Sequence, residues 1–325
     1  MSSFIAAGSA YATHGINTIP FFIYYSMFGM QRVGDLVWAA ADTRTRGFLL
    51  GGTAGRTTLA GEGLQHQDGH SHLLALAVPN LISFDPTFGF EIAVIIEDGI
   101  RRMYTNGESV FYYITVMNEQ YEMLPMPEGA REGILKGMYL LRPAAGAAEA
   151  PAKKAGAKAP ALRAQLLGSG AILNEVLKAQ QILAEQYGVA ADVWSVPSYQ
   201  ELYRDGHAAE RWNRLHPAET PRVPYVTQCL AGTEGVIVSA SDYVKLLADG
   251  IDRWMPRPLT SLGTDGFGRS EGRASLRDFF EVDAKHIVEA TLQALARDGK
   301  IDKSVVIKAI KDLGINPEKP NPAIS

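Results

Sequence analysis

The chain has 325 residues, of which 46% are hydrophobic and 20% charged, and these values are ordinary for a soluble globular protein of about two domains. A formal net charge of −4 provides no basic field for nucleic acid, and no apolar run is long enough to span a membrane. A single cysteine, Cys229, excludes an internal disulfide and fits a reducing compartment. Because the first residues lack the basic region of a secretory signal, we expect a cytoplasmic location.

Strand-like and helix-like segments alternate in residues 1–142. Strands are predicted at Thr18–Tyr24, Phe48–Gly51 and Val110–Val116, where aromatic, branched and glycine residues follow one another. Val33–Asp42 is predicted to be a helix, and the apolar run Ile92–Ile96 is predicted to be a strand inside a parallel sheet. This alternation is typical of an α/β domain.

Residues 143–161 differ sharply in composition from the rest of the chain. Pro143–Ala161 is almost entirely Ala, Pro, Gly and Lys, with no aromatic or β-branched residue. Such a segment buries too little apolar surface to offset its ordering entropy, so we predict a flexible linker. A short Ala-rich helix is the alternative, although Pro151 and Pro160 limit it. The linker divides the chain into domains at 1–142 and 162–325.

The second domain has a clearer pattern of strands and helices. Four strands and three helices are predicted, the third helix being the last element: strands Leu162–Leu167, Ala191–Val196, Gly235–Ser239 and Leu259–Gly263, and helices Ile172–Gln186, Asp242–Asp252 and Val282–Asp298. Both halves are therefore predicted to be doubly wound α/β domains with largely parallel sheets.

The densest group of polar residues lies in Gly51–His72, directly after a predicted strand. Five glycines precede Leu64, and the segment also carries several groups able to transfer protons: Glu62, His66, Asp68, His70 and His72. Ligands bind beyond the carboxyl ends of strands in α/β sheets, so this loop is the candidate active site. The alternatives are a solvated surface loop, or a zinc hydrolase site at His66, Asp68 and His70, although the H-E-x-x-H pattern is absent.

An aromatic run, Phe21–Phe28, precedes this loop in the chain and by itself predicts core packing. Together, the motifs Ile19–Asp35, Gly51–His72 and Leu262–Ser270 resemble a known family. They are similar to the pyrimidine-binding domain and the transketolase-like C-terminal domain of homodimeric pyruvate dehydrogenase E1 components. The resemblance runs along the whole chain except the linker.

The resemblance implies thiamine diphosphate as cofactor, bound with Mg²⁺ at the interface of a homodimer. In this family the enzyme decarboxylates pyruvate and reductively acetylates the lipoyl group of the E2 acyltransferase. Phe28 matches the ring that stacks on the cofactor's pyrimidine, and Tyr25 matches a residue beside it. His66 matches a histidine that faces the substrate, and Glu62 matches an acid in the same loop.

Two parts of the family pattern are not found in this sequence. One is the domain with the Gly-Asp-Gly motif that holds Mg²⁺ and diphosphate, and the other is the glutamate that bonds the pyrimidine ring. We therefore expect the chain to hold no metal and to be inactive alone. A non-catalytic two-domain assembly module is the alternative. In the C-terminal domain, the resemblance implies structural or interface roles for His207, His216, Asp265 and Arg269.

Overall fold

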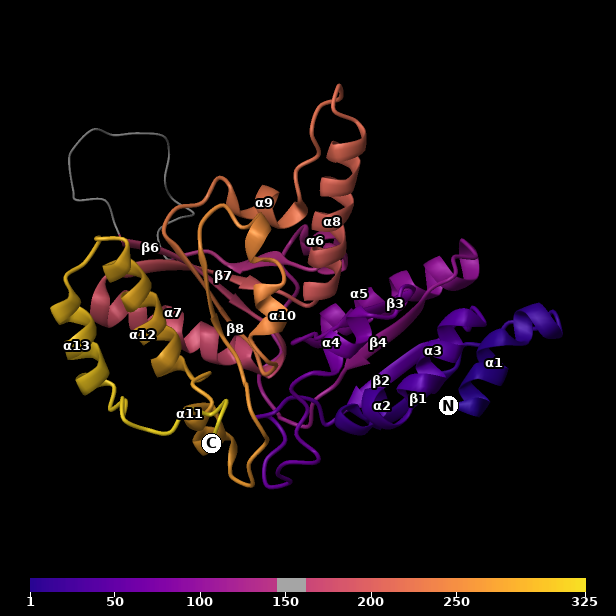
Figure 1. The fold of residues 1–325 in the computed structure, drawn as a ribbon, viewed down its shortest axis with the longest axis horizontal. Coiled ribbons are helices and arrows are strands. Elements are labelled where there is room, and N and C mark those ends of the chain that lie inside the picture. The colour runs from indigo at the N-terminus through magenta and orange to yellow at the C-terminus, as the bar shows by residue number, and fades with distance from the viewer. Residues whose placement is uncertain (145–161) are drawn as a thin grey trace.

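The computed structural model describes residues 1–144 and 162–325. Most of the predicted linker, residues 145–161, lies outside the described residues. The described elements form two sheets with their helices, the first in indigo and purple and the second in magenta to yellow (Figure 1). No helix in the described part of the chain is both long and apolar enough to cross a membrane.

The first sheet has four parallel strands in the order β1-β2-β4-β3. The strands are β1 (Phe21–Tyr25), β2 (Phe48–Gly52), β3 (Leu81–Phe84) and β4 (Phe111–Thr115). Their helices are α1 (Ser2–Thr13), α2 (Ser26–Arg32), α3 (Gly34–Asp42), α4 (Ser71–Leu76), α5 (Gly89–Ile100) and α6 (Ala130–Lys136), and a π-helical turn at Arg101–Thr105 extends α5. Every residue of β3 and β4 is buried, because helices pack on these two strands.

The second sheet has five strands in the order β5-β7-β6-β8-β9. Its strands are β5 (Tyr139–Arg142), β6 (Leu162–Gly168), β7 (Val189–Ser195), β8 (Val236–Ala240) and β9 (Leu259–Leu262). All neighbours are parallel except β5, which runs antiparallel to β7. The second sheet thus takes an edge strand from the chain before residue 143.

Helices cover both faces of the second sheet. They are α7 (Leu173–Tyr187), α8 (Tyr199–Leu215), α9 (Tyr225–Leu230), α10 (Leu246–Asp249), α11 (Arg273–Phe279), α12 (Ala284–Arg297) and α13 (Lys303–Asp312). Alternate residues of β6 point to opposite faces: Leu166 packs with residues of α7 and α12, and Leu167 packs with residues of α8 and α9. This arrangement is the predicted doubly wound α/β domain.

Three predictions about single elements need correction: one strand is a helix, one helix is shorter than predicted, and one helix is not the last element. Ile92–Ile96 lies within helix α5, where burial of Glu91, Val94 and Ile95 follows the helical period. Only Leu246–Asp249 of the predicted helix Asp242–Asp252 is α-helical, because the preceding residues bond to other loops. Val282–Asp298 is not the last helix, since α13 follows it. The other predicted strands and helices are confirmed to within a few residues.

Candidate active site

The segment between β2 and α4 lies between the two sheets (Figure 1) and contains the predicted site residues Glu62 and His66. It leaves the carboxyl end of β2 beside the carboxyl end of β1, because these two parallel strands are paired from Phe21 and Phe48 to Tyr25 and Gly52. Tyr25 is the last residue of β1, and α2 begins directly after it. The parallel pairing therefore brings two distant parts of the sequence to one sheet edge.

Four predicted residues come together there. The His66 ring packs edge-on against Phe28, with 4.9 Å between ring centroids, and against Tyr25, at 5.8 Å. Tyr25 and Phe28 are themselves 5.7 Å apart. Glu62 Oε2 lies 3.7 Å from His66 Nδ1, which has no hydrogen-bond partner among the described residues. The side chains of Glu62 and His66 are 45% and 28% exposed, so the group is open to solvent.

Basic and polar groups of α2 border this cluster. The Arg32 guanidinium lies 4.1 Å from the centre of the Phe28 ring, in a cation–π contact. Gln31 Nε2 lies 2.6 Å from His70 Nε2, so the His70 side chain is bonded to α2. A planar ligand that stacks on Phe28 must use the other ring face or displace Arg32.

The remaining polar residues of the loop have structural roles. Asp68 is fully buried, and its carboxylate accepts hydrogen bonds from the main-chain N–H groups of His70 and Ser71, at 3.0 and 2.9 Å. His72 is buried against Tyr243, and burial lowers the pKa of its imidazole to about 4 while Asp68 opposes that change. Its imidazole is therefore neutral near pH 7.

The zinc hydrolase alternative is not supported. In the part of the chain that the structure describes, three possible metal-binding residues come within reach of one another in one place only, at Asp278, Asp283 and His286. His66, Asp68 and His70 do not form such a group, because Asp68 caps the start of α4 and His70 bonds to Gln31.

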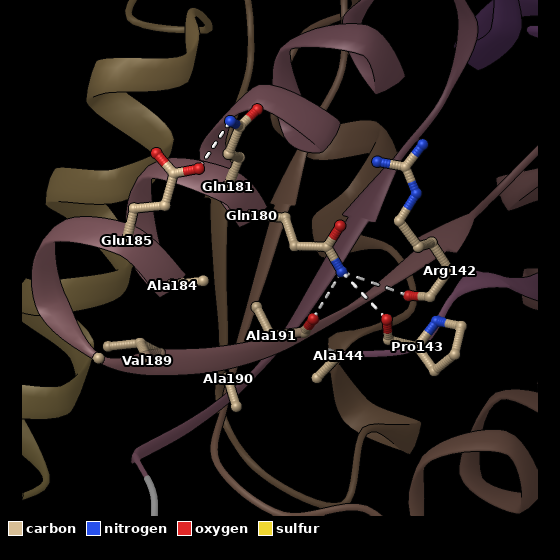
Figure 2. A pocket seen from close by; sticks show the side chains of 11 residues that line it. Arg142, Pro143, Ala144, Gln180, Gln181, Ala184, Glu185, Val189, Ala190 and Ala191 are labelled. Carbon is tan, nitrogen blue, oxygen red and sulfur yellow. Dashed lines mark hydrogen bonds between the residues drawn. The ribbon is translucent and has the colours of Figure 1, made fainter. Parts of the chain in front are cut away.

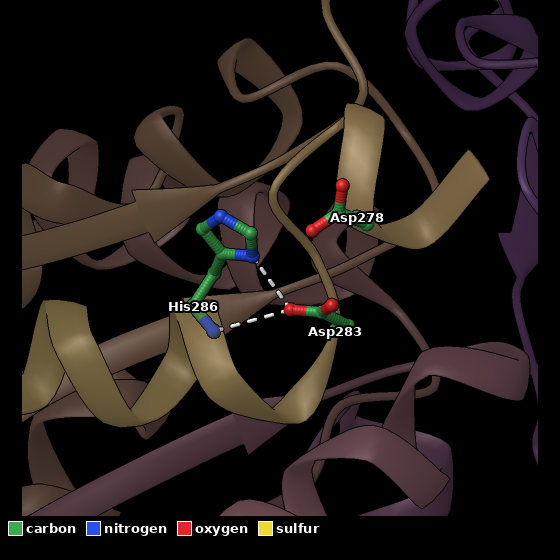
Figure 3. A group of neighbouring side chains, drawn as sticks. All are labelled: Asp278, Asp283 and His286. Carbon is green, nitrogen blue, oxygen red and sulfur yellow. Dashed lines mark hydrogen bonds and ion pairs between the residues drawn. The ribbon is translucent and has the colours of Figure 1, made fainter. Parts of the chain in front are cut away.

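The cluster Asp278–Asp283–His286 lies where the end of α11, which carries Asp278, meets the start of α12 (Figure 3). Asp283 caps the helix by accepting hydrogen bonds from the His286 main chain, and its carboxylate lies 2.6 Å from His286 Nδ1. Lys285 Nζ lies 2.5 Å from the Asp278 carboxylate, and Lys319 Nζ lies 3.3 Å from His286 Nε2. Because two ammonium groups already contact it, this cluster is a network of ion pairs.

A cavity of about 540 Å³ lies elsewhere, between β7 and α7 (Figure 2). Gln180, Val189 and Ala191 line it, together with Ala144. It opens at the amino-terminal edge of the sheet, where Val189 begins β7. Ligand sites of α/β sheets lie at the opposite edge, so this cavity is separate from the candidate site.

Sequence reasoning missed the residues of the second domain that hold the loop. Asp242 accepts hydrogen bonds from the main chain of Thr57 and Thr58, and the Arg56 guanidinium donates to the carbonyl groups of Thr264 and Gly266. Asp242 follows the carboxyl end of β8, and that position was a signal that could have identified it.

Of the four polar residues predicted to have structural or interface roles, three contact other residues of the second domain and Arg269 contacts the loop of the first. His216 stacks on Trp212 with 4.4 Å between ring centroids, and His207 packs on Tyr203. The Asp265 carboxylate accepts a hydrogen bond from Lys245 N at 3.1 Å. The main chain of Arg269 donates to Gln67 Oε1 at 2.7 Å.

Comparison with solved structures defines the class of the fold. Transketolase from Leishmania mexicana matches 86% of this chain and 34% of its own, with a TM-score of 0.61 and 18% identity. A structure described as split gene transketolase, inactive beta4 tetramer, matches 90% of this chain and 81% of its own, with a TM-score of 0.61 and 16% identity. The fold is therefore that of a transketolase-like α/β protein with two domains.

Sequence comparison identifies the family within this class. Residues 1–124 match the pyruvate dehydrogenase E1 component middle domain, and residues 152–283 match the transketolase-like C-terminal domain. The pyruvate dehydrogenase E1 component of Pseudomonas aeruginosa is 56% identical over 99% of this chain, and that of Escherichia coli is 52% identical over 99%. The chain belongs to the pyruvate dehydrogenase E1 component family and corresponds to its C-terminal part. It spans 35% of the length of these relatives.

Proposed function

We propose that this chain supplies the pyrimidine-side wall of a thiamine diphosphate site in a pyruvate dehydrogenase E1 component. In this assignment the complete assembly decarboxylates pyruvate and reductively acetylates the lipoyl group of an E2 acyltransferase. The observation that carries the proposal is the convergence of Tyr25, Phe28 and His66, from two paired strand ends, in a chain 56% identical to an E1 component.

The donor set fits the aromatic half of the cofactor. Phe28 and Tyr25 offer ring surface to a planar heterocycle, and the 45% exposure of Tyr25 leaves that surface open. Thiamine diphosphate supplies, when bound, the carbon nucleophile and the electron sink of the reaction. No group of metal-binding residues lies beside Phe28 among the described residues, so Mg²⁺ and the diphosphate are assigned to another part of the assembly.

The role proposed for His66 is proton transfer at Nε2. Glu62 faces Nδ1 at 3.7 Å, and a small approach would let its carboxylate accept the Nδ1 proton. That bond would fix the tautomer and orient the ring, leaving Nε2 as the nitrogen that takes or gives a proton near the substrate. Glu62 is thus assigned to orient the imidazole.

The proposed partners are a second E1 subunit and the lipoyl-bearing E2 acyltransferase. The proposed location of the assembly is the cytoplasm, where its reaction would connect glycolysis to acetyl-CoA. We infer that the chain is inactive alone, because the described residues contain no group of metal-binding side chains beside Phe28.

The test is pyruvate-dependent release of CO₂ with thiamine diphosphate and Mg²⁺. The chain is assayed alone and together with the preceding region of the Pseudomonas aeruginosa E1 component. Activity of the mixture only, reduced by Phe28→Leu and unchanged by Phe90→Leu, supports the proposal, since Phe90 stacks on Phe88 away from the site. Activity of the chain alone would refute the inferred need for a second part.

A non-catalytic assembly module is the second candidate. The structural neighbour that matches 81% of its own chain is described as an inactive beta4 tetramer of a split gene transketolase. A chain of this extent can therefore assemble without activity in that protein. Three results together would support this candidate. Light scattering would show a stable oligomer, calorimetry would show no binding of thiamine diphosphate, and the mixture would show no turnover.

A further inference from the structure

The loop that carries Glu62 and His66 has few hydrogen bonds of its own. The main-chain N–H groups of His66 and Gln67 both donate to the Gly63 carbonyl, at a long 3.2 Å. Gln67 Nε2 donates to the Leu59 carbonyl at 2.7 Å. A segment with so few internal bonds depends on its surroundings for its shape.

Asp242 of the second domain makes three hydrogen bonds to the start of this loop. Its carboxylate accepts hydrogen bonds from Thr57 N at 2.7 Å, Thr58 N at 3.0 Å and the Thr58 hydroxyl at 2.6 Å. The side chain is 2% exposed, so these charge-assisted bonds form away from water. Gly55, at a φ of +93°, lets the loop approach this closely, since a Cβ there would overlap the Asp242 carboxylate.

A second contact holds the loop directly beside His66. The Gln67 side chain is fully buried, and its Oε1 accepts a hydrogen bond from Arg269 N at 2.7 Å. Gly61 N donates to the Glu271 carbonyl at 2.9 Å. Both partners, Arg269 and Glu271, lie between β9 and α11 in the second domain. The loop is thus bound to the second domain on both sides of Glu62.

We propose that Asp242 is a positioning residue for the His66 imidazole. Through Thr57 and Thr58 it fixes the start of the loop, and the contact of Gln67 with Arg269 fixes its end. The second domain thereby sets the place of His66 relative to Phe28 without contacting the reacting atoms. This inference rests on the proposed function only for its catalytic consequence.

Amide hydrogen exchange of the whole chain tests the positioning itself. In Asp242→Asn one carboxylate oxygen becomes an NH₂ group that cannot accept a hydrogen bond from a threonine N–H. We expect exchange in residues 55–67 to become roughly tenfold faster or more, because a hydrogen bond to a charged acceptor is lost. Exchange in strand β6, which Asp242 does not contact, should stay unchanged.

Asp192→Asn is the matched control. Asp192 is a similarly buried carboxylate in the middle of β7, and it accepts hydrogen bonds from Ala144 N and the Gln165 amide in the same sheet. We expect this variant to leave exchange in residues 55–67 unchanged. Equal acceleration of the loop by both variants, or none by Asp242→Asn, would overturn the proposal.

Gln67→Met provides a second test if Asp242→Asn does not fold. This substitution keeps the side-chain volume and removes both hydrogen bonds of Gln67, so we expect the same acceleration near His66. In the mixture with the preceding E1 region, kcat for pyruvate should fall roughly tenfold while the affinity for thiamine diphosphate stays unchanged. An exchange effect without any turnover would reject the proposed function and retain the positioning role.

Discussion

Asp85 allows a quantitative test of the buried polar network between the domains. Its carboxylate follows β3, is 5% exposed, and accepts hydrogen bonds from the hydroxyl groups of Thr115 at 2.7 Å and Ser169 at 2.8 Å. Burial raises the pKa of Asp85 from 3.8 to about 7; the two hydroxyl groups oppose the rise, and the charges of Asp242 and Asp68 add to it. The folded protein therefore binds a proton here that the unfolded chain releases.

The size of the effect follows from the two pKa values. They differ by 7 − 3.8 = 3.2, and each unit corresponds to about 1.4 kcal/mol, so Asp85 changes the free energy of unfolding by about 4 kcal/mol. Because the folded pKa is the higher one, this stabilisation is fully present below pH 3.8 and is lost as the pH rises through about 7. Stability should thus decrease with rising pH between these limits.

His72 has the opposite effect within the same network. Its Nε2 lies 3.2 Å from the Thr115 hydroxyl, which in turn donates to Asp85, and burial lowers its pKa from 6.5 to about 4. Because the pKa of His72 is lower in the folded than in the unfolded chain, the protein loses stability as the pH falls from 6.5 to about 4. The two trends partly cancel in the wild-type protein, so a comparison with a variant is needed to separate them.

Urea unfolding of the wild type and of Asp85→Asn, measured from pH 5 to 8, provides that comparison. We expect the difference in their free energies of unfolding to shift in favour of the variant by about 3 kcal/mol as the pH rises, because the range from pH 5 to about 7 covers two of the 3.2 units between the pKa values and Asn cannot ionise. Glu128→Gln, at an exposed carboxylate, should give a flat difference. A flat difference for Asp85→Asn would falsify the assignment of a protonated Asp85.

Four further outcomes follow from the contacts. Arg277→Met should lower the free energy of unfolding in urea by about 3–5 kcal/mol, because it removes the buried cation that pairs with both the Glu119 and the buried Glu175 carboxylates; a loss below about 1 kcal/mol would contradict this. Leu166→Ala should cost about 2–5 kcal/mol in the same assay, since Leu166 is fully buried in the second core; an unchanged midpoint would show that the cavity collapses without cost. Burial raises the pKa of the Cys229 thiol, so iodoacetamide at pH 8 should alkylate it more slowly in the folded than in the unfolded chain, and equal rates would contradict its burial. In the reconstituted assembly, His66→Ala should reduce acetyl transfer roughly 100-fold with little change in cofactor affinity, whereas equal losses of both would argue against proton transfer by His66.

The sequence was sufficient for the α/β class and for most of the secondary structure. The strand Val110–Val116 was predictable because it is rich in β-branched and aromatic residues, and the helix Ile172–Gln186 because its apolar residues repeat with the helical period. The loop Gly51–His72 was also identified from sequence, because glycines and proton-transferring side chains are concentrated after a strand. The site roles of Phe28, Tyr25, His66 and Glu62 came from family resemblance, and the structure brings these four side chains together.

The tertiary structure alone decided the remaining features. The apolar run Ile92–Ile96 is compatible with a buried strand or a buried helix, and packing against the first sheet selects the helix. Asp242 accepts a hydrogen bond from Thr57, 185 positions earlier in the chain, and no local sequence pattern predicts a contact between residues so far apart. The raised pKa of Asp85 likewise depends on burial by both domains, with Thr115 on one side and Ser169 on the other. Local periodicity determines elements, whereas burial and contacts between distant residues arise only when the two sheets pack together.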